Sequence, residues 1–399
     1  MSATSPRTDV ESVTPFRYRV LVCPNAFKGS LTAALAARAI AEGLARVQEP
    51  TASFEALCLP LADGGDGTLE TLVEATGGEI HRATVRGPLG RPVEAAWGRL
   101  GGAQRETAVI EMAQASGLRL LSPEEYDPLH ATTYGTGELM RAALEAGCRT
   151  LIVGIGGSAT NDGGAGMAQA LGARLLDAQG NELPPGGAAL RQLARMDLRA
   201  FRLPAETKVI VACDVDNPLC GPEGAAAIYG PQKGATPEMA RVLDAALAHY
   251  AAILRAQLGA EVAEVPGAGA AGGLGAGLLA FCQATLQPGT EMALDVTQFD
   301  ARVRECRLVI TGEGRLDGQT ARGKVVAGVA RRARAAGVPA VALAGSVQEG
   351  AEALLRAEGL TGALCILDGP LTVEEAMRDA YRLLAGAAER LARLLALRL

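Results

Sequence analysis

A set of acidic residues lies on short glycine-rich stretches, where carboxylates are well placed to reach a ligand. Carboxylates at strand-to-loop junctions can bind Mg²⁺ through hard oxygen atoms or take a proton from an alcohol, and phosphoryl transfer needs both. Any one of these residues could instead only cap a helix. The set comprises Asp63 and Asp66 in LADGGDGT, Asp162 in TNDGG, Asp214 and Asp216 in CDVDNPL, Asp295 in ALD, and Glu313 and Asp317 in TGEGRLDGQT.

A lysine and nearby amide groups follow the first predicted strand, in PNAFKGS. Because this stretch also precedes a predicted helix, Lys28 and the amides near Ser30 could hold phosphate oxygens. In the alternative, Lys28 is a solvated loop charge and Ser30 or Thr32 caps the helix. The sequence leaves both interpretations open.

Further anion-binding groups lie in the second half of the chain. Arg315 and Lys324 flank Asp317, so that carboxylate has a cation on each side in the sequence. Gly272 and Gly273 in GAGAAGGLGAG could offer bare amides to another anion, or could form a tight turn at the start of a helix. These residues join the candidates for a phosphate site.

Two glycine-rich stretches resemble nucleotide-binding motifs. GIGGSATNDGG, residues 154–164, follows a predicted strand and fits the dinucleotide pattern G-x-G-x-x-A. However, NDGG stands where the helix of that fold should already run, and the Asp162 carboxylate would repel a pyrophosphate. GQTARGKV resembles a P-loop but has Val325 where Ser or Thr is required. A nicotinamide-dependent dehydrogenase is therefore the less favoured alternative, and Lys324 can still meet a phosphate.

The elements that must position these residues follow an α/β pattern. Short apolar runs alternate with helical patterns rich in Ala and Leu, which is typical of parallel strands joined by helices. The same alternation returns near the C-terminus, where a long helix over 373–397 closes the chain. The expected strands are 18–23, 54–60, 308–311, 340–343 and 363–367, and the expected helices are 32–46, 67–75, 323–336 and 350–358.

The middle of the chain has a different pattern, which indicates a second domain. VRGPLGRPVEAAWGRL is typical of antiparallel hairpins with a Pro-Leu-Gly turn. We therefore expect an α/β protein in which residues 17–79 and 287–399 form a discontinuous parallel-sheet domain. Residues 80–286 form an inserted α/β domain with a mixed sheet, and residues 1–16 form a flexible leader.

Composition narrows the class of protein. The chain has 399 residues with 49% hydrophobic content, enough for a large core. Its 38 basic and 44 acidic residues give a net charge of −6 without a block of like charges, so nucleic acid and membrane are not expected partners. The expected partners are small molecules, and a homodimer remains open.

Cysteine usage and the N-terminal residues predict a cytoplasmic protein. The 8 cysteines are scattered, with neither a C-x-x-C pair nor the Cys/His spacing of a zinc site, so we expect reduced thiols. The polar leader lacks the hydrophobic core of a signal peptide, and no apolar run reaches the length of a membrane span.

Taken together, a series of ordered blocks resembles the bacterial glycerate kinase family, over about residues 18–386. The blocks are CPNAFKGSLTA, PLADGGDGTLETL, GTGELMRAAL, GIGGSATNDGGAGMAQALG, CDVDNPLCGP, YGPQKGA, GAAGGLG and TGEGRLDGQTARGKV. The resemblance implies ATP- and Mg²⁺-dependent phosphorylation of D-glycerate, with 2-phosphoglycerate as the usual product. It also implies a flavodoxin-like, or Rossmann-like, parent domain interrupted by a second α/β domain. Phosphorylation of the 3-hydroxyl, or of a related hydroxy acid, is the main alternative.

The same resemblance implies roles for the candidate residues, by matched motif position. Lys28 and Lys324, with Ser30, Gly272 and Gly273, would bind ATP phosphates. Asp63, Asp66, Asp214 and Asp216 would lie near Mg²⁺. The glycerate carboxylate would be held by Gly156, Gly157, Ser158, Asn161 and Arg315. The hydroxyl proton would pass to Asp317 or Asp162, and Lys28 and Glu313 would complete the catalytic set.

Overall fold

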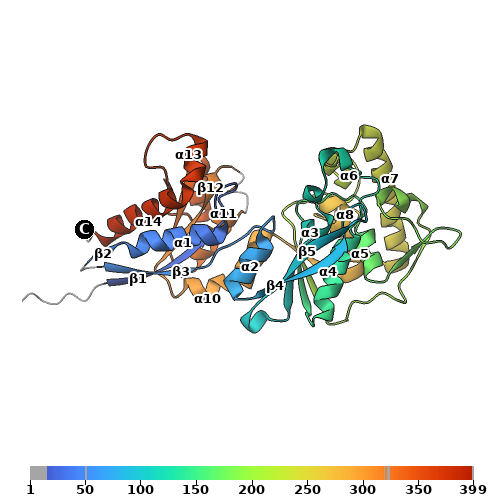
Figure 1. The fold of residues 1–399 in the computed structure, drawn as a ribbon, viewed down its shortest axis with the longest axis horizontal. Coiled ribbons are helices and arrows are strands. Elements are labelled where there is room, and N and C mark those ends of the chain that lie inside the picture. The colour runs from blue at the N-terminus through green and yellow to red at the C-terminus, as the bar shows by residue number, and fades with distance from the viewer. Residues whose placement is uncertain (1–15, 50–51, 319, 321–323, 398–399) are drawn as a thin grey trace, which may run out of the picture. The chain divides into compact units, whose positions relative to one another are not determined.

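The computed structural model of the chain describes residues 16–49, 52–318, 320 and 324–397. Contacts divide the chain into two units, which are described separately (Figure 1). Unit 1 consists of Met1–Pro60 and Gln298–Leu399, and unit 2 consists of Leu61–Thr297. The expected leader, except Phe16, and half of GQTARGKV (residues 319 and 321–323) lie outside the described residues.

Unit 1 is built on a six-stranded sheet in the order β14-β13-β12-β1-β3-β2, in which only the β2–β3 pair is antiparallel. Its strands are β1 (Phe16–Pro24), β2 (Gln48–Glu49), β3 (Ala52–Cys58), β12 (Leu308–Leu316), β13 (Ala340–Val347) and β14 (Gly362–Cys365). Its helices are α1 (Ala33–Ala45), α10 (Phe299–Val303), α11 (Val325–Ala335), α12 (Ala351–Glu358), α13 (Val373–Arg378) and α14 (Ala380–Ala396).

Helices cover both faces of this sheet. Residues Val20 and Val22 of β1 point to one face, where they pack with the apolar sides of α1 and α14. The alternate residues, such as Leu21 and Val309, are also fully buried, and α11 contacts β12 and β13. Strands buried on both faces explain the nearly continuous apolar runs in the sequence.

The strand order of unit 1 reverses at β1. After β1 the chain crosses to β3 on one side, and β12, β13 and β14 then follow on the other side. Ligands of open α/β sheets bind at the carboxyl ends of the strands at such a reversal. The carboxyl ends of β1 and β12, where Pro24 pairs with Gly312, are therefore the expected binding edge of unit 1.

Two expectations about unit 1 are corrected. β12 does not end at Thr311 but continues to Leu316, because its pairing with β13 extends as far as Leu316 and Val347. Glu313 and Arg315 therefore lie on a strand and not on a loop. The single C-terminal helix is in fact two helices, α13 and α14, separated at Asp379.

Unit 2 contains a mixed six-stranded sheet in the order β11-β10-β7-β6-β5-β4, and a separate hairpin β8-β9. Its strands are β4 (Glu79–Arg86), β5 (Pro92–Arg99), β6 (Thr107–Glu111), β7 (Thr150–Gly154), β8 (Arg174–Leu176), β9 (Arg195–Asp197), β10 (Lys208–Ala212) and β11 (Thr285–Gln287). Its helices are α2 (Thr68–Thr76), α3 (Ala113–Ser116), α4 (Tyr134–Glu145), α5 (Ala165–Ala170), α6 (Ala225–Tyr229), α7 (Pro237–Leu258), α8 (Ala270–Cys282) and α9 (Gly289–Val296), with 3-10 turns at Gly102–Gln104, Leu118–Leu120, Pro123–Glu125, Gly187–Gln192 and Pro231–Lys233.

The mixed sheet agrees with the expected α/β class. β4, β5 and β6 are antiparallel neighbours, as VRGPLGRPVEAAWGRL predicts, and β6, β7, β10 and β11 are parallel. The limits of the unit differ from those expected, since residues 61–79 and 287–297 group with the inserted segment. The reason is packing, because α2 contacts β5 and β6 and the backbone of Gly289 lies against Asp63.

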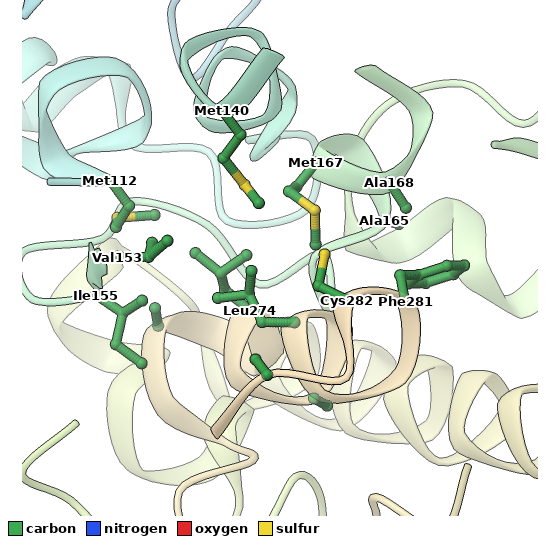
Figure 2. Packing of buried hydrophobic residues seen from close by; sticks show 14 of the residues in the cluster. Met112, Met140, Val153, Ile155, Ala165, Met167, Ala168, Leu274, Phe281 and Cys282 are labelled. Atoms are coloured by element: carbon green, nitrogen blue, oxygen red, sulfur yellow. The ribbon is translucent and has the colours of Figure 1, made fainter. Parts of the chain in front are cut away.

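The core of unit 2 lies between the sheet and helices α4, α5, α7 and α8. Figure 2 shows Met140 of α4 and Met167 of α5 pointing toward α8, where Leu274 and Cys282 meet them. All four residues are at most 4% exposed. Unbranched methionines fill irregular space well, which suits a junction of three helices that cross at different angles.

Candidate functional site

The parallel strands of unit 2 end together at one edge of its sheet. The pairing register places Glu111 of β6, Gly154 of β7, Ala212 of β10 and Gln287 of β11 in one row. Because carboxyl ends of parallel strands share an edge, the loops that follow these residues also come together. This carboxyl edge of unit 2 carries most of the residues that the sequence singled out in the first two thirds of the chain.

The loop Asp63–Gly67 lies across this edge. A side chain on Gly64, where φ is +86°, would come within 2.8 Å of Ala212 Cβ, and one on Gly154 would come within 3.0 Å of the Gly64 carbonyl oxygen. Glycine is therefore required where the loop crosses the strand ends. The amide N–H of Gly65 donates to Asp63 Oδ1 (3.3 Å), and Asp63 is half-buried.

Asp66, the second acid of the loop, is exposed and lies beside a cation. Its Oδ1 is 3.5 Å from Nη1 of Arg119. Gly156 and Gly157, which follow β7, are also exposed, and a side chain on Gly157 would come within 3.7 Å of Asp66 Oδ1. The structure therefore brings the predicted acidic loop and the predicted glycine loop together.

Ser158 and Asn161 lie at the end of the glycine loop. Ser158 is 8% exposed, and Asn161 is completely buried. Neither the oxygen nor the nitrogen of the Asn161 side chain has a hydrogen-bond partner among the described residues. Since buried amides are nearly always paired, this side chain is suited to a ligand or an ordered water.

Asp162 is held in the interior by many donors. Its Oδ2 accepts hydrogen bonds from the Thr133 amide (2.8 Å) and hydroxyl (2.9 Å), the Thr132 hydroxyl (3.3 Å) and the Gly166 amide (3.2 Å). Its Oδ1 accepts from the Gly164 amide (3.1 Å). Burial raises the pKa of this carboxyl, while these hydrogen bonds oppose the rise. Because no part of Asp162 is exposed, the geometry favours a structural role over that of a base.

A buried lysine that the sequence did not single out supports the same loop. Nζ of Lys233 donates to the carbonyl oxygen of Thr160 (2.7 Å), and the residue is 1% exposed. Burial lowers the pKa of Lys233 to about 7, and the negative charge of Asp162 limits the fall. The block YGPQKGA contains this lysine and could have drawn attention to it, but nothing in the block indicates that the side chain is buried.

Gly272 and Gly273 serve packing. Together with Ala271 they have positive φ values of 67°, 87° and 53°, so the start of α8 is left-handed. A side chain on Gly272 would come within 1.8 Å of the Thr160 carbonyl oxygen. Both glycines are buried. The geometry therefore favours a tight turn at the start of a helix over a site that offers bare amides to an anion.

The predicted metal residues lie on two separate loops of unit 2. Asp214 and Asp216 are exposed on the loop after β10, and Asp214 Oδ1 accepts the Gly289 amide (2.9 Å). Within the described ranges there is no group of three or more His, Cys, Asp or Glu side chains that could hold a metal ion. Asp63, Asp66, Asp214 and Asp216 therefore do not fit a closed protein cage for Mg²⁺. Asp295 accepts a hydrogen bond from Gln287 Nε2 (2.9 Å).

The dinucleotide motif lacks its structural context. After β7 the chain is irregular through Gly164, and α5 begins only at Ala165. A dinucleotide-binding glycine loop leads directly into a helix whose N-terminal amides face the pyrophosphate. Here the amide of Gly164 at the start of α5 is already used by Asp162.

In unit 1, the Lys28 loop follows β1 at the binding edge. Lys28 is exposed, and its backbone passes over Gly314 of β12, since a side chain on Gly314 would lie 3.7 Å from the Lys28 nitrogen. The amide and hydroxyl of Ser30 both donate to the Phe27 carbonyl oxygen, at 2.9 and 3.0 Å. Thr32 caps α1. Lys28 is thus available to an anion, whereas the polar groups of Ser30 are already engaged.

Glu313 and Asp317 meet at Thr320. The Thr320 hydroxyl donates to Glu313 Oε1 (2.6 Å), and the Thr320 amide donates to Asp317 Oδ1 (3.1 Å). Glu313 is 9% exposed, and the Asp317 side chain is 28% exposed. The two predicted carboxylates therefore share one partner, and Asp317 is the more accessible.

Of the two predicted cations of this region, Arg315 lies beside Asp317. The side chain of Arg315 is 64% exposed, and its Nε is 3.9 Å from Asp317 Oδ2. Lys324 is the N-cap residue of α11, so it stands where the positive end of a helix also attracts anions. Unit 1 thus presents Lys28, Arg315 and Lys324 along with an accessible carboxylate.

Glu111 is a further residue that the sequence did not single out. It ends β6, is 3% exposed, and accepts the Leu69 amide at the start of α2 through Oε1 (2.9 Å). Its Oε2 is buried without a partner among the described residues. Burial raises the pKa of this carboxyl. An acidic residue directly after the apolar run AVI was the available signal.

Comparison with known proteins places this geometry in a family. Residues 20–396 match the glycerate kinase family. A glycerate kinase of Halalkalibacterium halodurans is 50% identical over 375 residues, which cover 94% of this chain and 97% of that protein. A glycerate 2-kinase of Escherichia coli K12 is 45% identical over 380 residues, which cover 95% and 98%.

A solved structure shows the same fold. The crystal structure from Salmonella typhimurium LT2, described as a glycerate kinase 2, has a TM-score of 0.86 and 46% sequence identity, and the match covers 95% of this chain and 98% of that one. These matches confirm the expected α/β class and the resemblance seen in the sequence blocks. This chain belongs to the glycerate kinase family, a family of kinase enzymes.

Proposed function

We propose that this chain transfers the terminal phosphoryl group of ATP to a hydroxyl group of D-glycerate. The observation that carries the proposal is identity of 45 to 50% with glycerate kinases along almost the whole chain. The geometry supports it, because both units present charged residues at the carboxyl edge of a parallel sheet. Phosphoryl transfer requires mainly neutralised charge and alignment, which such edges can supply.

ATP enters as its Mg²⁺ complex in this proposal, so the metal arrives with the substrate. Mg²⁺ keeps several waters and usually takes only one or two protein carboxylates besides phosphate oxygens. The half-buried Asp63 and the exposed Asp66 are suited to that task, as are Asp214 and Asp216. The lack of a closed cage among the described residues is compatible with this arrangement.

The residues of unit 1 take the roles of phosphate binding and proton transfer. Lys28 and Lys324 bind phosphate oxygens, and Arg315 adds a third cation. Asp317 accepts the proton of the attacking hydroxyl, since its side chain is 28% exposed while Glu313 is nearly buried. Glu313 orients Thr320, whose amide in turn holds Asp317.

The residues of unit 2 hold the acid substrate. Exposed Gly156 and Gly157, with Ser158, offer polar backbone and hydroxyl groups at the sheet edge. The Asn161 amide, which has no partner among the described residues and is completely buried, is suited to reach the ligand through a water beside it. We leave Asp162 out of the reacting groups because its oxygens are already engaged.

We further propose that the 2-hydroxyl is phosphorylated, in keeping with the name of the Escherichia coli relative. Phosphorus NMR of the product formed from ATP, Mg²⁺ and D-glycerate tests both the reaction and the position. We expect the coupling pattern of 2-phosphoglycerate, a phosphate on a CH carbon. A phosphate coupled to a CH₂ group would instead show 3-phosphoglycerate. Turnover with tartronate or hydroxypyruvate but not with glycerate would contradict the assignment of the substrate.

The proposed location of this reaction is the cytoplasm. All eight cysteines are free in the structure, as the scattered spacing predicts. A reducing compartment keeps thiols in that state. No helix in the described part of the chain is long and apolar enough to cross a membrane.

A further inference from the structure

Arg119 is a cation at the carboxyl edge of unit 2 that the sequence analysis did not identify. It lies in the 3-10 turn Leu118–Leu120, which follows β6 and α3. The turn is fastened to the glycine loop, because the Leu118 amide donates to the Gly157 carbonyl oxygen (2.9 Å) and Gly117 forms a bridge with Ser158. Arg119 is therefore held next to the residues proposed to receive the substrate.

The guanidinium of Arg119 has capacity to bind a further anion. It makes an ion pair with Asp66 at 3.5 Å, and the structure gives it no hydrogen bond within the described residues. Its side chain is 46% exposed. A guanidinium carries five N–H donors in a fixed fork that matches a carboxylate. An exposed ion pair of this kind contributes little to stability, so stability alone does not explain its position.

The surrounding charges make a cation necessary at this edge. Besides the effect of burial, Asp66 and Glu70 both act electrostatically on Glu111 and raise the pKa of its carboxyl, while Arg119 acts in the opposite direction. An anionic substrate would be repelled by these carboxylates without a compensating positive charge. Gly157 is exposed and has φ of +72°, and a side chain there would come within 3.7 Å of Asp66 Oδ1, so glycine keeps side-chain atoms away from this carboxylate.

We propose that Arg119 binds the carboxylate of the substrate and thereby selects a hydroxy acid over a neutral polyol. This inference rests on the proposed function, which it deepens by assigning the acid-selecting residue to unit 2. The substrate carboxylate accepts hydrogen bonds from N–H groups of the guanidinium, while Asp66 remains near the other edge of the guanidinium. The hydroxyl end of the substrate is then directed away from Arg119.

The test compares D-glycerate and glycerol as phosphoryl acceptors for the wild type, Arg119→Gln and Arg119→Lys. We expect Arg119→Gln to raise the KM for D-glycerate about 30-fold or more, as expected for a lost charged hydrogen bond, and to leave the KM for ATP within about twofold. Preference for glycerate over glycerol should fall by a similar factor. Arg119→Lys keeps the positive charge but lacks the forked N–H donors of a guanidinium, so we expect a smaller rise in the KM for D-glycerate than in Arg119→Gln.

A matched control is Arg174→Gln, because Arg174 is 48% exposed and also pairs with a carboxylate, that of Glu182. It should leave both KM values unchanged. Partial recovery of Arg119→Ala by added guanidinium ion would support direct binding. If Arg119→Gln folds normally and keeps the wild-type KM for D-glycerate, the inference is wrong.

Failure of the proposed function would look different. In that case the wild type itself would not phosphorylate D-glycerate. Calorimetric titration of D-glycerate into wild type and Arg119→Gln would then decide the point. Binding that is lost in the variant supports the inference, whereas equal binding, or no binding to either protein, overturns it.

Discussion

Two loops of unit 2 share the sequence pattern D-G-G-x-G, and they differ in what surrounds them. In each loop the first aspartate accepts the amide of the residue two positions later through Oδ1, at 3.3 Å for Asp63 and 3.1 Å for Asp162. In each loop the following glycine has positive φ, 86° at Gly64 and 63° at Gly163. The two turns therefore begin alike, and they differ at the next residue, since Gly164 has a φ of +76° whereas Gly65 does not have a positive φ.

The two loops differ in what surrounds the first aspartate. Asp162 Oδ2 is surrounded by donors from Thr132 and Thr133, which precede α4, whereas Asp63 is half-buried at the sheet edge. One loop thus joins α4 to α5 inside the unit, and the other lies at the sheet edge, where we propose that its carboxylates meet a ligand. A short motif sets how its turn begins, but residues distant in sequence determine what surrounds it.

The largest expected effect comes from Asp162→Ala. Removing this carboxylate leaves the Thr133 groups and the Gly164 and Gly166 amides buried without an acceptor, so we expect a loss of at least about 4 kcal/mol in the free energy of unfolding. Urea denaturation followed by circular dichroism measures it. Asp63→Ala removes one weak hydrogen bond and should cost less than about 1 kcal/mol. Equal losses in the two variants would abolish the distinction between the loops.

The next effect concerns activity. Asp63→Ala should lower kcat/KM about 100-fold, as expected when one electrostatic contact to the transferring group is lost. Steady-state kinetics with D-glycerate and ATP checks this value. Asp177→Ala is the matched control, because Asp177 also accepts an amide of its own turn (2.9 Å) but lies on the turn after β8. Normal activity of Asp63→Ala would remove the acidic loop from the site.

Counted per pH unit, the smallest effect is a pH dependence of stability that arises from Lys233, which supports the Asp162 loop. Burial lowers the pKa of Lys233 to about 7 from 10.5, so below pH 7 both folded and unfolded chains hold the proton and burial of the charge costs most. Between about pH 7 and 10 the unfolded chain binds more protons, and stability rises with pH by at most about 1.4 kcal/mol per pH unit.

Lys233→Met should lack this rise. The free energy of unfolding of the wild type minus that of the variant should therefore increase from about pH 7 to 10. Denaturation curves at several pH values measure the difference. Lys208→Met, at the exposed start of β10, is the control and should remain parallel to the wild type. A pH-independent difference for Lys233→Met between about pH 7 and 10 would show that the folded chain keeps the Lys233 proton over this range, so that burial does not lower the pKa of this lysine.

The order and type of the main elements could be predicted from the sequence because they depend on local patterns. Apolar runs and helical periods located β1, α1, β13 and α12 to within a few residues. β12 was expected to end at Thr311 because glycine and charged residues follow. Pairing with β13 extends it to Leu316, and that neighbour lies outside any local window.

In the candidate site, too, some residues could be selected from local patterns and others could not. Residue types and loop positions were sufficient to select Asp63, Asp66, Gly157 and Lys28, all of which the structure leaves accessible. Burial could not be read locally, so Asp162 was grouped with the accessible acids. Local patterns were also not sufficient to select Glu111, Arg119 and Lys233. Their positions depend on α2, the glycine loop and the Thr160 carbonyl, which are distant in sequence.

The insertion also affects how the chain is synthesised. β1 obtains its second neighbour only from β12, and the Thr311 hydroxyl that donates to the Cys23 carbonyl is 288 positions further along. The ribosome therefore synthesises all of unit 2 before it makes β12, and one edge of β1 still lacks its strand while unit 2 emerges. An open parallel edge is prone to pairing with other chains. Slow translation of the segment before β12 would prolong this exposure and should favour aggregation over the native enzyme.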